Sequence, residues 1–99
     1  MRIPEKLVIC GVTYKVSLMK GSIDADEEFG RINYSAREIR IQDHGAETNW
    51  ATLLHEIMHG LSFHYGLGLD DTEEKHQEMD ALASILMDTL ARNNIIKVG

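Results

Sequence analysis

The first half of the chain alternates between apolar and polar residues, as a half-buried strand does. From Val12 to Leu18 every second side chain is apolar. A short apolar run at 7–9 precedes this stretch, and Cys10-Gly11 lies between the two. Because glycine tolerates the positive φ that a tight turn requires, the pattern predicts a β-hairpin over residues 7–18.

A second alternating pair follows nearer the middle of the chain. Ile32 and Tyr34 stand on one side of the polar segment 35–38, and Ile39 and Ile41 stand on the other. Two short alternating runs around a polar turn are typical of a hairpin, so we expect two more antiparallel strands here.

After residue 45 the apolar spacing changes to three and four residues, which is the period of an amphipathic helix. We expect the first helix to be capped by Thr48 or Asn49, to run to about Tyr65 and to stop at Gly66. Its apolar face would consist of Trp50, Leu53, Leu54, Ile57, Met58 and Leu61.

A second helix is predicted after the connection 66–70. Asp71 and Glu74 have the spacing of a capping box, and the helical pattern runs to about Arg92 before Asn93-Asn94. Apolar residues recur at intervals of three and four, namely Met79, Leu82, Ala83, Leu86 and Leu90. We expect the centre of the buried stripe to be formed by Met79, Leu82, Leu86 and Leu90.

Length and element order together predict one α+β domain spanning 1–99. With 99 residues there is room for a single core, β-rich over about 1–45 and helical over 46–93. The expected architecture is a small antiparallel sheet packed on two helices.

Charge and composition narrow the classes of partner. Ten Lys and Arg against sixteen Asp and Glu give a net charge of −6, without a basic run, so we expect no nucleic-acid partner. The apolar stretch Leu7–Tyr14 is too short to span a bilayer, so we expect no membrane association. The acidic run 24–28 is interpreted as a solvated loop. A single cysteine, Cys10, excludes an internal disulfide and suits a reducing compartment, so we expect a cytoplasmic protein.

The segment that carries chemistry is His55-Glu56-Ile57-Met58-His59. Residues four apart lie on the same face of a helix, so the imidazoles of His55 and His59 can converge on one ion. Glu56 lies about 100° around the helix from His55, where it can reach a water activated by that ion. The spacing therefore predicts a zinc site with Glu56 as the general base.

Two histidines leave a catalytic zinc site one protein ligand short. The candidates elsewhere in the chain are His44, His64, His76, Glu78 and Asp80. His64 lies about 140° around the helix from His59, so it should point away from the metal.

The second helix offers better donors than His64. With the buried stripe centred near Leu82, Glu78 lies on one shoulder and His76 on the other. We predict Glu78 as the third ligand, with His76 and Asp80 as alternatives. Asp80 is also suited to orient a metal-bound imidazole.

These motifs resemble those of a minimal gluzincin-type zincin. The segment Leu54–Leu61, followed some twenty residues later by Glu78–Ala83, is similar to small phage and bacterial ImmA/IrrE-like metallopeptidases. The resemblance implies that His55, His59 and Glu78 bind zinc. It also implies that Glu56 is the general base of peptide-bond hydrolysis and that a peptide or protein substrate lies along an edge strand, expected at 39–42.

Two alternatives to a peptidase remain open at the level of sequence. The chain can be a non-catalytic binding module of zincin fold in a phage or bacterial regulatory system. It can also hold a closed structural metal site with four ligands, His76 among them. A peptidase requires Glu56 for its activity, whereas neither alternative does.

Overall fold

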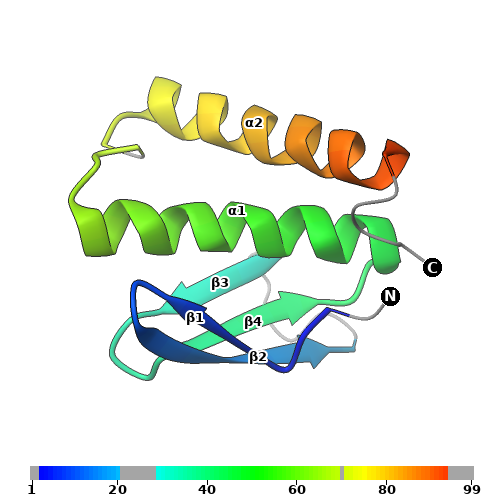
Figure 1. Cartoon of the computed structure of the whole chain (residues 1–99), viewed down its shortest axis with the longest axis horizontal. Coiled ribbons are helices and arrows are strands. Elements are labelled where there is room, and N and C mark those ends of the chain that lie inside the picture. Colours follow the sequence, from blue (N-terminus) through cyan, green and yellow to red (C-terminus); the bar gives the residue numbers. More distant parts are fainter. Residues whose placement is uncertain (1–2, 21–28, 70, 94–99) are drawn as a thin grey trace.

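The computed structural model describes residues 3–20, 29–69 and 71–93. Its elements are the strands β1 (Lys6–Ile9), β2 (Val12–Met19), β3 (Gly30–Asn33) and β4 (Glu38–Gln42), followed by the helices α1 (Ala46–Tyr65) and α2 (Glu73–Arg92). Figure 1 shows three layers, with α1 lying on the sheet and α2 lying on α1. The predicted α+β class is confirmed, while the acidic run 24–28 lies outside the described residues.

The four strands form a sheet in the order β1-β2-β4-β3. Both predicted hairpins are present, because β1 pairs with β2 and β3 pairs with β4 in antiparallel fashion. The hairpins join through β2 and β4, which run parallel, so the sheet is mixed and the expectation of a purely antiparallel sheet is wrong. This join gives β4 a neighbour on each side. The outer strands are therefore β1 and β3, and the expectation of an edge strand at 39–42 is wrong. The sheet also packs on α1 alone rather than on both helices, because among the described residues α2 contacts only α1.

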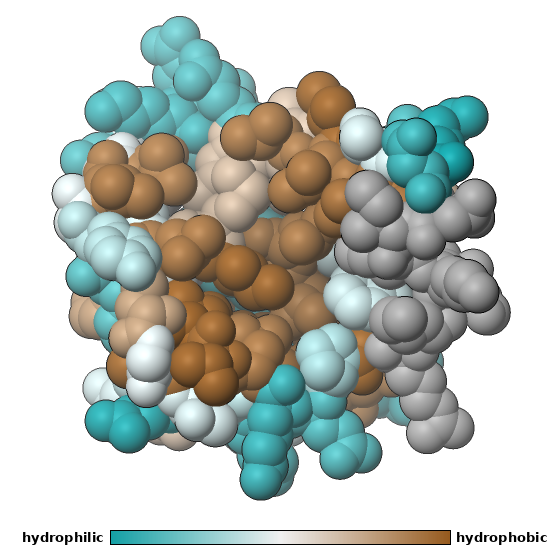
Figure 2. Space-filling model, in the orientation of Figure 1, coloured by the Kyte–Doolittle hydropathy of each residue, from teal (hydrophilic) through white to brown (hydrophobic). Residues whose placement is uncertain are grey.

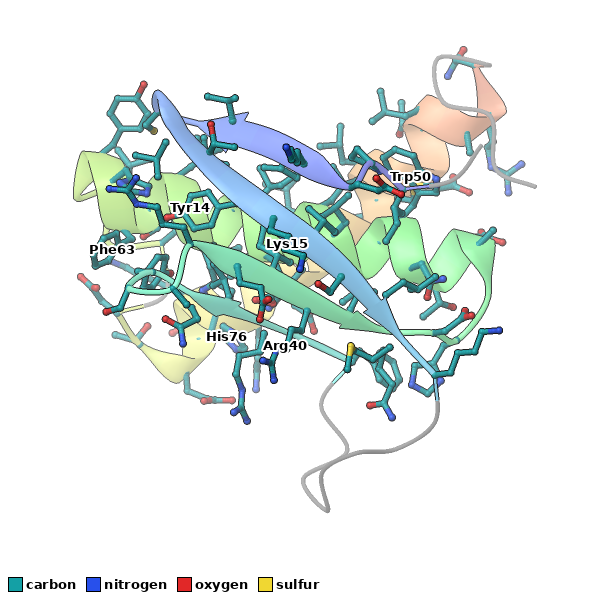
Figure 3. All side chains as sticks on the ribbon, turned by 90° about the horizontal axis from the view of Figure 1, so that it is seen from below. Tyr14, Lys15, Arg40, Trp50, Phe63 and His76 are labelled. Atoms are coloured by element: carbon teal, nitrogen blue, oxygen red, sulfur yellow. The ribbon has the colours of Figure 1, made fainter. Side chains whose placement is uncertain are left out.

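The core lies between the sheet and α1, because alternate strand residues face the helix. Tyr14, Ile39 and Ile41 are completely buried there, and Leu53 on α1 is 1% exposed. Figure 3, seen from the sheet side, shows Tyr14 turned toward α1 while Lys15, the next residue of β2, faces solvent. Because of this alternation, one apolar face of the sheet packs along α1.

Helix α1 starts three or four residues earlier than the predicted caps, Thr48 or Asn49, imply. Its N-cap is Gly45, without a side-chain cap, and Asn49 is instead buried in the first turns. The Asn49 amide donates to Oδ1 of Asp43, and its oxygen accepts from the backbone N–H of His44. Asn49 thus organises the loop that enters the helix. At the other end, Gly66 is left-handed with φ 64°, which confirms the predicted stop.

Helix α2 has the predicted length but a different buried face. Thr72, rather than Asp71, is its N-cap and accepts a hydrogen bond from the backbone N–H of Lys75. The residues buried against α1 are Met79, Ala83 and Met87. Burial of Met79 and Ala83 confirms part of the prediction, but Leu82 and Leu86 are 54% and 40% exposed, so the centre of the predicted stripe is displaced by one position. The small Ala83 faces α1, whereas a leucine at the centre of the contact would hold the helices further apart.

The displaced face of α2 predicts unequal costs for two truncations. Replacing Met87, which is 2% exposed, with Ala should destabilise the protein by about 2–5 kcal/mol through lost burial and a residual cavity. Replacing Leu82 with Ala is the matched control and should cost less than about 1 kcal/mol, because that side chain is largely in solvent. Urea denaturation of both variants measures the difference, and equal costs would contradict the observed face.

Apolar side chains gather across the middle of the face seen in Figure 2. On α2 the exposed large hydrophobic residues are Leu82, Ile85 and Leu86. Among the described residues, neither helix has an apolar run long enough to cross a lipid bilayer.

Candidate metal centre

Helix α1 brings His55 and His59 together by its own geometry. The two residues are one turn apart, and their Nε2 atoms lie 3.0 Å from each other. The ring centroids are 4.6 Å apart, with the rings nearly perpendicular. This part of the site follows directly from local sequence, because a regular helix places positions i and i+4 side by side.

Helix α2 supplies a third imidazole, that of His76. One ligand atom from each of His55, His59 and His76 can be chosen so that all three lie within 4.8 Å of one another. The His76 ring centroid is 5.2 Å from each of the other two. Figure 3 shows His76 on the side of the molecule where β3 lies. The three histidines form what we call the histidine group.

The structure does not bring Glu78, the predicted third ligand, into the histidine group. Glu78 is exposed, whereas His76 is half-buried. Two positions along a helix turn a side chain by about 200°, so the two residues cannot face the same groove. His76 shares its face with Met79 and Ala83, the residues that pack on α1. The face of α2 that meets α1 therefore decides which candidate reaches the site.

Asp80 lies one turn after His76 and contacts the histidine group from outside. Its Oδ1 is 3.0 Å from Nδ1 of His55, the ring nitrogen that does not face His59. That nitrogen is buried, and the approach of the carboxylate is not aligned as a hydrogen bond. We therefore describe it as a contact between the carboxylate and the imidazole nitrogen, without a hydrogen bond. A carboxylate beside Nδ1 favours the tautomer that carries its proton on Nδ1. In that tautomer the lone pair of Nε2 is available to bind a metal.

Glu56 is buried beside the histidine group. It is 4% exposed and contributes, together with His55 and His59, to the wall of a cleft of about 830 Å³. The cleft lies between α1, α2 and the outer strand β3, which contributes Gly30 and Ile32 to its lining. A carboxylate is thus present in the same cleft as the three imidazoles.

The surroundings of His55 keep it neutral. Its pKa is lowered from the usual 6.5, first by burial and then by the nearby His59, while Asp80 acts in the opposite direction. A neutral imidazole is the form that binds a metal, so the environment favours binding over protonation.

The lowered pKa of His55 predicts that the metal-free protein loses stability in weak acid. In the unfolded chain a histidine takes up its proton near pH 6.5, but the folded state resists that uptake. The folded state then binds fewer protons, so the contribution is complete above about pH 6.5 and declines as the pH falls below it. Urea midpoints measured from pH 7.5 to 5.5 test this. His55→Gln, which cannot titrate, should show a shallower decline, and an equal decline in both proteins would contradict the assignment.

His64 lies apart from the histidine group, as its spacing predicts. Its Nε2 is 2.6 Å from the hydroxyl of Tyr14 in the core. Tyr34 lies nearer to the histidine group, since its hydroxyl donates to the backbone carbonyl of His59 and its ring stacks on Phe63 with 3.9 Å between centroids. These aromatic contacts fasten the last turns of α1 to the strands and hold His59 in place.

The histidine group fits a zinc ion by its chemistry. Imidazole nitrogens are favoured zinc ligands, and tetrahedral coordination at ~2.0–2.1 Å separates two ligand nitrogens by about 3.3 Å. The His55 and His59 nitrogens, 3.0 Å apart, need to move by only a few tenths of an ångström to reach that separation. The three ligand atoms together lie within 4.8 Å of one another, so a bound ion would draw the group closer. Three imidazoles would leave one position of a four-coordinate ion open toward the cleft.

Comparison of the chain with protein-family models, with curated proteins and with solved structures gives no match.

Proposed function

We propose that the protein is a zinc-dependent peptide hydrolase in which His55, His59 and His76 bind the metal and Glu56 is the general base. The observation that carries the proposal is the placement of a buried carboxylate in the same cleft as three imidazoles whose ligand atoms lie within 4.8 Å of one another. A structural zinc site needs a fourth protein ligand, whereas a hydrolytic site needs three ligands, an open position and a base.

In this proposal each residue has a separate task. A zinc ion held by the three histidines would polarise the scissile carbonyl and make water nucleophilic near neutral pH. Glu56 takes a proton from the attacking water and returns it to the leaving amine. Asp80 holds the ring of His55 in its metal-binding orientation through the 3.0 Å contact to Nδ1.

The proposed substrate is an extended peptide bound along β3. In the antiparallel pairing of β3 with β4, the carbonyl of Phe29 accepts a bond from the N–H of Gln42. Because successive residues of a strand point their backbone groups to opposite sides, Gly30 and Ile32 direct theirs away from β4. Both residues line the cleft. A peptide strand can add to this edge by main-chain hydrogen bonds. Such bonds would recognise the peptide backbone and would not require a particular side chain.

The proposal extends to the class and setting of the enzyme. The two histidines and the glutamate on one helix, with a third ligand from the next helix, support the resemblance to ImmA/IrrE-like metallopeptidases. Here a histidine takes the place that the resemblance gives to a glutamate. Cys10 is exposed, and an exposed lone thiol persists best in a reducing compartment, which supports a cytoplasmic peptidase.

A second candidate is a binding module that uses the metal for stability. It is favoured by the position of α2, which in the described part of the chain packs on α1 and on no strand. A metal joining His76 to α1 would then act as a clamp between the helices.

One set of measurements separates the two candidates. The protein is loaded with one equivalent of zinc and incubated with unfolded casein and with a mixture of short peptides. A hydrolase cleaves them, stops when a chelator removes the zinc and resumes when zinc is restored. Zinc-dependent stability without any cleavage would favour the binding module and would contradict the peptidase.

A further inference from the structure

Strand β3 comes closest to α1 at Gly30, its first residue. A Cβ atom placed on Gly30 would lie 2.6 Å from Cγ2 of Thr52 and 3.2 Å from the carbonyl oxygen of Arg40. The first distance is shorter than any carbon contact in a packed interior, where carbons approach to about 3.5–4.0 Å. The same Cβ would touch Cγ of Glu56 at 3.5 Å. The backbone of β3 therefore passes directly against Thr52 and Glu56, two of the α1 residues that line the cleft.

Thr52 has little freedom to make room for a larger residue. It is 8% exposed, and its hydroxyl donates to the backbone carbonyl of Thr48 at 2.9 Å. Rotating the side chain to move the methyl group away from Gly30 would break that hydrogen bond. The Arg40 oxygen belongs to β4, the strand that pairs with β3, and it is equally constrained. A side chain at position 30 must therefore push β3 away from α1.

We propose that Gly30 is a positioning residue for Glu56, an inference that rests on the proposed function. By having no side chain, Gly30 lets β3 close against α1 beside Glu56. This close approach holds Glu56 in the wall of the cleft that it shares with the histidine group, and it sets the position of the β3 edge along the same cleft. Gly30 has no side chain that could touch metal or substrate. Its role is to set the distance between β3 and α1.

The backbone conformation of Gly30 is not what requires a glycine. Its φ lies outside the left-handed region, in contrast to Gly11 and Gly66, with φ of 78° and 64°. Alanine is therefore acceptable to the backbone at position 30, and the effect of Gly30→Ala isolates the contact with Thr52.

The test is a double-mutant cycle between positions 30 and 52. Gly30→Ala should lower kcat by about 10- to 100-fold, because a displacement near 1 Å at a catalytic group has an effect of this size. Zinc affinity should change by less than about threefold, because the ligands lie on α1 and α2. Thr52→Ser removes the methyl group that is met at 2.6 Å and keeps the hydroxyl, so the double variant should recover most of kcat. Gly30→Ala with unchanged kcat, or a loss of kcat that Thr52→Ser does not relieve, overturns the proposal.

Val16→Ala is the control for lost stability away from the cleft. Val16 is 6% exposed in the core on β2, and it is not among the described residues that line the cleft. This variant should lower stability in urea and leave kcat unaltered. If Gly30→Ala and Val16→Ala both lower kcat in proportion to lost stability, Gly30 has only a structural role.

A second readout keeps the inference separate from the peptidase proposal. In protein loaded with cobalt(II) in place of zinc, the visible absorption bands report the surroundings of the metal without any turnover. Gly30→Ala should shift these bands, and Thr52→Ser should restore them. If the wild-type protein cleaves nothing but the cobalt bands behave in this way, the peptidase proposal fails and the positioning role stands. Identical bands in all four proteins of the cycle refute the positioning role.

Discussion

Replacing Glu56 with Gln should abolish peptide cleavage while leaving zinc bound. The side chain is 4% exposed and lines the cleft beside His55 and His59, so the amide fills the same space as the carboxylate. An amide cannot take a proton from the attacking water, and removal of a general base lowers kcat by about 10²–10⁴-fold. Zinc affinity should remain within about threefold of the wild type, because the three imidazoles are unchanged. Single-turnover cleavage of a peptide and a zinc titration measure the two quantities.

Glu78→Gln is the control for the Glu56 variant. Glu78 is an exposed carboxylate on α2, outside the histidine group, and its replacement removes the same charge without touching the cleft. It should leave both kcat and zinc affinity unaltered. Two results would argue against the base assignment. One is a Glu56→Gln protein that loses zinc as completely as it loses activity, and the other is a Glu56→Gln protein that retains full activity.

Replacing His76 with Ala should remove most of the zinc affinity and most of the stability that zinc confers. Substituting residues that only support a ligand costs 10- to 100-fold in affinity, so loss of a ligand should cost at least about 100-fold. A ligand at about 100 times its Kd stabilises a protein by ~2.7 kcal/mol. For a domain of this length that corresponds to a Tm increase of roughly 10–20 °C, which the His76→Ala protein should largely lack. Calorimetry with and without zinc measures the increase.

The control for His76 lies two residues away on the same helix. Glu78→Ala removes a side chain of similar length from the exposed face of α2, so its zinc-dependent Tm increase should equal that of the wild type. If Glu78→Ala loses the increase and His76→Ala keeps it, the sequence-based assignment of the third ligand is correct and the histidine group is not the metal site. An increase that survives in both variants would indicate a metal site elsewhere.

The parts of the molecule that depend on local sequence could be predicted closely. The turn at Cys10-Gly11 has two positive φ angles, 54° and 78°, and the glycine in the sequence is a clear indication of such a turn. The proximity of His55 and His59 follows from helical spacing alone. These features involve neighbours in the chain, so pattern and stereochemistry are enough to determine them.

The parts that depend on packing between elements could not be predicted in the same way. The buried stripe of α2 was predicted around Leu82 and Leu86 because they are large and apolar, although both are substantially exposed. That error of one position, about 100° of rotation, favoured Glu78 over His76. A better signal was present in the spacing of His76, Met79, Ala83 and Met87, which lie on one face with a small residue at the point of contact.

The parallel pairing of β2 with β4 has a consequence for the order in which the chain folds. Each hairpin closes a short loop and can form by itself within microseconds. The pairing of Val16 with Ile39 joins residues more than twenty positions apart, so the entropy of closing a long loop opposes it. We expect this join between the hairpins, together with the docking of α1 over it, to form the transition state for folding. Mutations at Ile39 should therefore slow refolding. Mutations in β1, which lies away from this join, should mainly accelerate unfolding.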